Sequence, residues 1–231
     1  MGSYLVIGGS SGIGKALVGL LSEANHSVYS TYHNTHVVNS TKIIYQPLNV
    51  LSNDINLDGL PEQLDGLVYC PGRINLKPFK RFSAEDFLDD FNLQVVGATK
   101  VIQHVMPRLL KSDSASIVLF STIAVQSGFS FHSQVSASKG AIEGLTRSLA
   151  AEFAPKIRVN AVAPSLTDTP LASKFLNTSQ KIEAQSAKNP LNKIGAPQDI
   201  ANMVEFLLST KASWITGQIM HIDGGFSAIK Q

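Results

Sequence analysis

The feature that most constrains the fold is a glycine-rich turn near the start of the chain. The apolar run at residues 4–7 leads directly into Gly8-Gly9-Ser10-Ser11-Gly12-Ile13-Gly14. An amphipathic helical pattern follows, whose apolar residues share one face: Ile13, Ala16, Leu17, Leu20 and Leu21. Glycines let the backbone approach a pyrophosphate, and a helix N-terminus supplies free N–H groups. This order of elements is typical of a dinucleotide site, and a tight turn without a ligand is the alternative.

Short β-branched runs alternate with longer amphipathic runs along the rest of the chain. Strands are predicted at residues 4–7, 27–32, 43–46, 66–70, 116–121, 157–163 and 219–222. One helix is predicted to open at a capping-box-like Ser83 and run towards Pro107, and another to start at Pro197. This alternation predicts a doubly wound α/β Rossmann fold, with a parallel sheet of about seven strands and helices on both faces. Because no repeat or long linker interrupts the chain, we expect a single domain over residues 1–231.

Two stretches depart from this alternation. About ten residues separate Tyr32 from Ile43, which are too few for a crossover helix and its turns. Residues 170–196 are polar and compatible with helix, and we expect them to form a mobile cover over a cleft.

Composition excludes several classes of protein. A net charge of +2 is too small to indicate a surface that binds nucleic acid or a membrane. No apolar run reaches the roughly 18 residues that span a bilayer. The one cysteine, Cys70, has no partner for an internal disulfide, and the first strand leaves no room for a signal peptide. We therefore expect a cytoplasmic protein.

The spacing of Gly8, Gly12 and Gly14 resembles that of the short-chain dehydrogenase/reductase family, and the similarity continues along nearly the whole chain. Residues 69–72, Tyr-Cys-Pro-Gly, stand where the family usually has Asn-Asn-Ala-Gly. Residues 158–165 resemble the family's strand that ends in Pro-Gly, and residues 214–225 are close to its C-terminal signature. The resemblance is to members such as 3-oxoacyl-ACP reductases. It implies an NAD(P)(H)-dependent oxidoreductase of a small carbonyl or alcohol, assembled as a homodimer or homotetramer.

Residues 133–141 resemble the family's catalytic helix, but Val135 stands where the family has tyrosine. In the family, this tyrosine exchanges a proton with the substrate oxygen, and a lysine four residues later lowers its pKa and holds the ribose. The resemblance gives that lysine's role to Lys139 and the catalytic serine's role to Thr122. It gives Asn92 the role of a helix asparagine whose backbone carbonyl helps to hold a water. Loss of a general acid typically costs about 10²–10⁴ in rate.

His132 is a second possible proton donor. It lies seven residues before Lys139, a spacing similar to the tyrosine–lysine separation in the family's enoyl-reductase branch. An imidazole can donate a proton near neutral pH. A surface or cap histidine at the start of the helix is the alternative. The other histidines, including His33 and His36, have no third ligand nearby in the sequence, so we expect no metal site.

The end of the second predicted strand bears on the choice of cofactor. No acidic residue is present there to bond the ribose hydroxyls of NAD(H), which favours NADP(H). His33 and Asn34, with Ser10 and Ser11, are candidates to receive the 2′-phosphate, although His33 is equally compatible with a solvated loop. Asn49 replaces the aspartate that the family places against the adenine. The cofactor residues implied are Gly8, Ser10, Ser11, Gly12, Ile13, Gly14, His33, Asn34, Asn49, Val50, Cys70, Gly72, Lys139, Pro164, Thr167 and Thr169.

Two functions follow from this pattern. The first is reduction of a ketone or 3-oxoacyl-type carbonyl by hydride transfer, with an atypical proton donor. The second is a catalytically silent, cofactor-binding homologue that acts as a sensor or as the structural partner of an active paralogue. Small residues on the helix around Lys139, such as Gly140 and Gly144, suit either a dimer interface or packing against the sheet.

Overall fold

A seven-stranded sheet forms the centre of the computed structural model, which describes residues 1–35 and 37–229. The strands are β1 (Ser3–Ile7), β2 (Ser27–Tyr32), β3 (Ile43–Pro47), β4 (Gly66–Tyr69), β5 (Ala115–Phe120), β6 (Ile157–Pro164) and β7 (Ile219–Ile222). Every pair of neighbours is parallel, in the order β3-β2-β1-β4-β5-β6-β7. All seven predicted strands are confirmed, with boundaries that differ by at most one residue.

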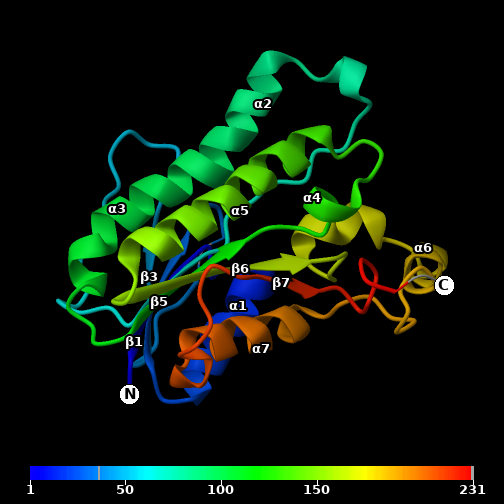
Figure 1. The fold of residues 1–231 in the computed structure, drawn as a ribbon. Coiled ribbons are helices and arrows are strands. Elements are labelled where there is room, and N and C mark those ends of the chain that lie inside the picture. Colours follow the sequence, from blue (N-terminus) through cyan, green and yellow to red (C-terminus); the bar gives the residue numbers. More distant parts are fainter. Residues whose placement is uncertain (36, 230–231) are drawn as a thin grey trace.

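Helices cover both faces of this sheet (Figure 1). On one face lie α1 (Gly12–Glu23) and α7 (Pro197–Leu208), which pack on Val6, Val68 and Val118. On the other lie α3 (Gly97–Leu109) and α5 (Ser133–Phe153), which pack on the alternate residues of the same strands, among them Leu5 and Leu67. Because successive side chains of a strand point to opposite faces, the central strands β1, β4, β5 and β6 are buried on both faces, and the doubly wound prediction is confirmed.

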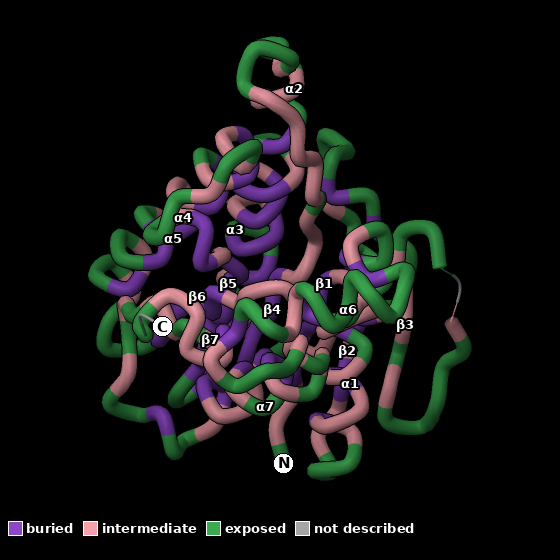
Figure 2. The backbone as a smooth tube through the Cα atoms, turned by 90° about the vertical axis from the view of Figure 1, so that its right-hand side faces the viewer, coloured by how far each residue is buried: buried purple, intermediate pink, exposed green. Residues whose placement is uncertain are grey.

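Burial is concentrated in the strands and in the helix surfaces against them, while α2 (Ala84–Phe91) reaches away from the core (Figure 2). The remaining helical segments are α4 (Ala124–Ser127), α6 (Ser179–Ser186) and the 3-10 turns η1 (Phe79–Arg81), η3 (Pro170–Phe175) and η4 (Thr210–Ala212). No helix in the described residues is long and apolar enough to cross a membrane.

The structure agrees in part with the predictions for the two stretches that interrupt the strand–helix alternation. Between β2 and β3, no helix forms within the described residues. The stretch at residues 170–196 contains η3 and α6 and borders a cavity, while its mobility stays a prediction.

The helix predicted to run from Ser83 towards Pro107 differs in detail. It consists of α2, a π-helical turn η2 (Asn92–Val96) and α3, and Pro107 lies inside α3 instead of ending it. A π-helical turn widens the helix and changes which side chains face inward, and such turns are frequent at functional sites.

Tyr69, at the end of β4, contacts this wide turn directly. Its hydroxyl donates a hydrogen bond of 2.6 Å to the Leu93 carbonyl. A Cβ atom at Gly97 would lie 2.4 Å from that hydroxyl, which is closer than real Cβ contacts come. Glycine at position 97 therefore lets the helix lie against β4, where the site residues begin.

We predict that Gly97→Ala lowers the free energy of unfolding by roughly 1–3 kcal/mol, because the added methyl overpacks against Tyr69. Urea denaturation measures this change. In a Tyr69→Phe background, which removes the hydroxyl, Gly97→Ala should cost clearly less. An equal cost in both backgrounds would contradict the steric explanation.

Candidate active site

A cavity of about 950 Å³ opens at the carboxyl edge of the sheet. The turns that follow β1, β2, β4, β5 and β6 all meet there, because parallel strands end on the same side. The strand order reverses between β1 and β4, which is where open α/β sheets bind their ligands. Every predicted site residue except Asn92 lines this cavity.

The glycine-rich turn forms one end of the cavity. Gly8 (φ +79°) and Gly12 (φ +52°) have left-handed backbone conformations that disfavour other residues. A Cβ atom at Gly14 would lie 2.3 Å from the Gly8 carbonyl oxygen, so glycine there allows α1 to begin directly against the turn. Ser11 caps α1 without a side-chain bond, and the first helical turn contains no acidic residue. These N–H groups and their partial charge fit the pyrophosphate of a dinucleotide.

The charged residues that line the cavity also bear on the kind of ligand that it fits. Lys139, Arg73 and Lys188 line the cavity, and no aspartate or glutamate does so among the described residues. His33 and Asn34 stand exposed at its rim, directly after β2. A cavity with cations and no carboxylate fits an anionic ligand.

Lys139 is the buried cation of the site. It lies in the second turn of α5, is 9% exposed, and donates a hydrogen bond of 2.8 Å from Nζ to the Phe120 carbonyl. Burial lowers the pKa of Lys139 to about 8, while the negative charge of Asp90 opposes that decrease. Burial also raises the pKa of the neighbouring Cys70 thiol to about 12, so that the thiol stays protonated.

Val135 and Thr122 lie in the same cavity as Lys139. Val135 is 7% exposed and contributes only methyl groups. The Thr122 hydroxyl accepts a long hydrogen bond of 3.3 Å from the Ala124 N–H, and its own proton remains available to a substrate oxygen. The structure therefore places the lysine and the hydroxyl that the resemblance implies in one cavity with Val135.

His132 combines features of both roles considered for it. It occupies the N-cap position of α5 without making a side-chain cap bond, and it lines the cavity. Its Nδ1 lies 2.8 Å from the Ser130 carbonyl oxygen, a contact that requires the proton on Nδ1. The neutral ring therefore has its lone pair on Nε2, and only the charged ring has a second proton to give.

Asn92 does not reach the cavity. Its side chain is exposed, and its carbonyl accepts the Gly97 N–H inside the π-helical turn. Gln94, two residues later, is buried and lines the cavity instead. The sequence analysis missed Gln94 because a regular helical period does not anticipate the wide turn. It also missed Arg73 and Lys188, for which the sequence offers no local signal.

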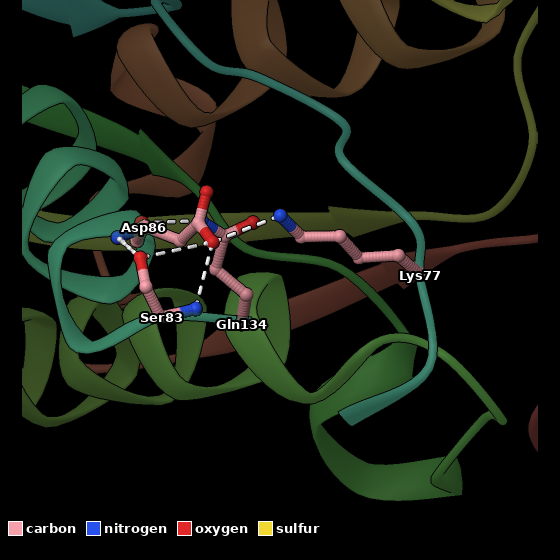
Figure 3. Close-up of polar contacts among 4 residues, drawn as sticks. All are labelled: Lys77, Ser83, Asp86 and Gln134. Atoms are coloured by element: carbon pink, nitrogen blue, oxygen red, sulfur yellow. Dashed lines mark hydrogen bonds and ion pairs between the residues drawn. The ribbon is translucent and has the colours of Figure 1, made fainter. Parts of the chain in front are cut away.

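A polar cluster fixes the helix starts beside the site (Figure 3). Ser83 and Asp86 form the predicted capping box, and Asp86 also pairs with Lys77 at 2.8 Å. The Lys77 ammonium is the main cause of the lowered pKa of Asp86. Gln134 donates a hydrogen bond from Nε2 to the Asp86 carbonyl. The cluster therefore ties the loop after β4 to the first turn of α5, next to Val135.

Within residues 1–35 and 37–229, no group of three or more potential metal ligands gathers. His36, which was considered with His33 as a metal ligand, lies outside the described residues.

Comparison with known proteins places these features in context. A family model described as enoyl-(acyl carrier protein) reductase matches residues 8–227. A tropinone reductase homolog of Arabidopsis thaliana is 30% identical over 240 residues, covering 96% of this chain and 91% of the relative. The 3-oxoacyl-[acyl-carrier-protein] reductase FabG of Thermotoga maritima is 30% identical over 241 residues, covering 96% of each chain. The solved structure of ElxO with NADP bound has a TM-score of 0.86 at 26% identity, covering 99% of this chain and 100% of that one.

We predict that the free energy of unfolding of the wild-type protein rises between about pH 8 and about pH 10.5, and that Lys139→Met does not share this rise. In this window the unfolded wild-type chain binds more protons than the folded one, because burial lowers the pKa of Lys139 from its ordinary value of 10.5 to about 8. The free energy of unfolding of Lys139→Met relative to wild type should therefore be lower at about pH 10 than at about pH 7, by roughly 1–3 kcal/mol.

Urea denaturation at about pH 7 and about pH 10 measures this difference. Lys156→Met, at an exposed position, serves as the control and should show no such dependence on pH. A difference between Lys139→Met and wild type that is the same at both pH values would contradict the buried-charge account.

Proposed function

Because the chain belongs to the short-chain dehydrogenase/reductase family of oxidoreductases, we propose that it reduces a ketone or 3-oxoacyl-type carbonyl with NADP(H), using a proton donor other than tyrosine. The observation that carries this proposal is the buried Lys139, with a pKa of about 8, in one cavity with Thr122 and the glycine-rich turn. A buried cation with a perturbed pKa beside a hydroxyl is typical of a catalytic site.

The residues that line the cavity fit the proposed cofactor. The turn at residues 8–14 and the start of α1 would hold the pyrophosphate, with Asn49 and Val50 beside the adenine and Thr167 and Thr169 beside the nicotinamide. When bound, the cofactor supplies the hydride. Preference for NADP(H) is supported by His33 and Asn34 at the rim, by the absence of carboxylates from the described lining, and by the NADP bound to ElxO.

Carbonyl reduction adds a hydride to carbon and a proton to oxygen, and the proton must come from the chain or from water. The Thr122 hydroxyl is available to hydrogen bond the carbonyl oxygen and so to orient it. Lys139 is largely protonated at neutral pH, yet with a pKa of about 8 its ammonium releases a proton far more readily than an ordinary lysine. We therefore assign the role of proton donor to Lys139. His132 is the second donor, and it acts only in its charged form.

A silent, cofactor-binding protein is the second candidate function. It is favoured by Val135, a side chain with no titratable atom at the position of the family's acid. In that case, the cavity would hold NADP(H) without consuming it, and the chain would act as a sensor or as the partner of an active paralogue. The cytoplasmic location, the single domain and the homodimer or homotetramer stay predictions.

We predict that the wild-type protein oxidises NADPH slowly with a panel of ketones and 3-oxoacyl thioesters, and that Val135→Tyr raises the rate by roughly 10²–10⁴, since it restores a general acid. Spectrophotometry at 340 nm, about the absorbance maximum of the reduced nicotinamide, measures consumption. NADPH affinity, measured by fluorescence titration, should stay within about threefold of wild type.

Three outcomes separate the alternatives. Saturable NADPH binding without consumption by wild type, together with activity in Val135→Tyr, would indicate the silent protein. If activity is lost in His132→Phe and unchanged in Val135→Tyr, the proton donor is His132 and not Lys139. Absence of NADPH binding would refute both candidate functions.

We also predict that NADPH binds more tightly than NADH, and that His33→Asp reverses this order. A carboxylate at the end of β2 bonds the ribose hydroxyls and repels a 2′-phosphate, so the dissociation constant for NADPH should rise about tenfold or more. Fluorescence titration with each dinucleotide measures this. His104→Asp, on the exposed side of α3, is the control. Tighter binding of NADH by wild type would contradict the preference.

A further inference from the structure

Two buried polar side chains, one before the wide turn and one within it, have no part in the chemistry described so far. Asp90 and Gln94 are each 1% exposed, and Gln94 donates a hydrogen bond of 2.7 Å from Nε2 to Asp90 Oδ2. Asp90 is the second-last residue of α2, and Gln94 lies within the π-helical turn, four residues later. A carboxylate this deeply buried is uncommon unless it is paired.

Each side chain also has one oxygen without a partner. Asp90 Oδ1 and Gln94 Oε1 are buried and accept no hydrogen bond in the structure. Leaving a buried acceptor unpaired is costly, so such an atom in a native protein calls for an explanation. The pair therefore has two acceptors to offer to a donor nearby.

Lys139 is the nearby donor. A Cβ atom built at Gly72 would lie 3.5 Å from Gln94 Oε1 and 3.9 Å from Lys139 Nζ, so both atoms border the same small space. The lysine uses one of its three donors on the Phe120 carbonyl, which leaves two for other partners.

Electrostatics connects the same groups. The Asp90 carboxylate raises the pKa of Lys139 against the larger effect of burial. Cys70, at the end of β4, is the other titratable group that acts on the ammonium, and its thiol is protonated because burial raises its pKa to about 12. From β5 the ammonium meets only the Phe120 carbonyl. Of the two groups that raise the pKa of Lys139, Asp90 is therefore the one that bears a carboxylate.

We propose that Asp90 and Gln94 are positioning residues for Lys139: the Asp90 carboxylate favours the charged form of the buried ammonium, and the unpaired Gln94 Oε1, which borders the same space as Lys139 Nζ, holds the ammonium at the cavity. This inference rests on the proposed function, in which Lys139 gives its proton to the substrate oxygen. It explains why the helix widens at this point, since the wide turn brings Gln94 inward and leaves Asn92 outside. Asp90 and Gln94 act through the lysine and need not touch the substrate.

The test is an NMR titration of the Lys139 ammonium in the full-length protein. The protein is labelled with carbon-13 at lysine Cε, and the Lys139 signal is assigned by its loss in Lys139→Met. Asp90→Asn keeps the shape of the side chain and removes its charge, so the pKa of Lys139 should fall by roughly one pH unit. Asp89→Asn, at the exposed neighbouring position on α2, should leave it unchanged.

Gln94→Met removes the second acceptor at similar volume, and it should shift the titration in the same direction. If Asp90→Asn fails to fold, the Lys139 titration in Gln94→Met serves as the test of the proposal. A Lys139 titration that is the same in wild type and in the folded variants would overturn the proposal.

The enzymatic readout separates this inference from the proposed function. In active protein, the pH at which kcat/KM falls should move down with the titration in Asp90→Asn, while NADPH affinity stays within about threefold. A shifted titration in protein that reduces no carbonyl compound would refute the proposed function and leave the assignment of Asp90 supported.

Discussion

The site depends on the burial of one ammonium group. Lys139 has little contact with solvent, and burial of a charge is among the most costly arrangements in a protein unless other groups compensate. The chain supplies a carbonyl at the end of β5 and a carboxylate on α2. The resulting pKa of about 8 is the property on which the proposed role of Lys139 as proton donor rests.

Close approaches of backbone elements make this arrangement possible. Glycines at positions 8, 12 and 14 fold the first turn so that α1 begins at the cavity, and glycine at position 97 lets the wide turn lie against Tyr69. The loop after β4 is then held to α5 through Lys77, Asp86 and Gln134 (Figure 3). Small residues and a few polar contacts thus bring segments that are distant in sequence to one edge of the sheet.

Much of this architecture could be predicted from the sequence, because the sheet follows from local patterns. Strand alternation predicted all seven strands, and the glycine spacing predicted the sharp turn that forms one end of the cavity. The inward face of the helix after Ser83 could not be predicted. One π-helical turn rotates Asn92 outward and Gln94 inward, and no periodic pattern signals it. The proposed effect of Asp90 on Lys139 and the position of Arg73 in the cavity lining depend on how segments far apart in the chain come together, which a single sequence does not reveal.

The central claim is that this cavity transfers a hydride to a carbonyl compound, and transfer of label tests it most directly. Wild-type protein at concentrations near those of the reactants is incubated with NADPH deuterated at the nicotinamide C4 position and with a ketone, and the alcohol is analysed by mass spectrometry. The account predicts an alcohol that carries one deuterium on the former carbonyl carbon, even if turnover is slow. Saturable binding of the cofactor without any deuterated alcohol, after prolonged incubation with the full ketone and thioester panel, would contradict it.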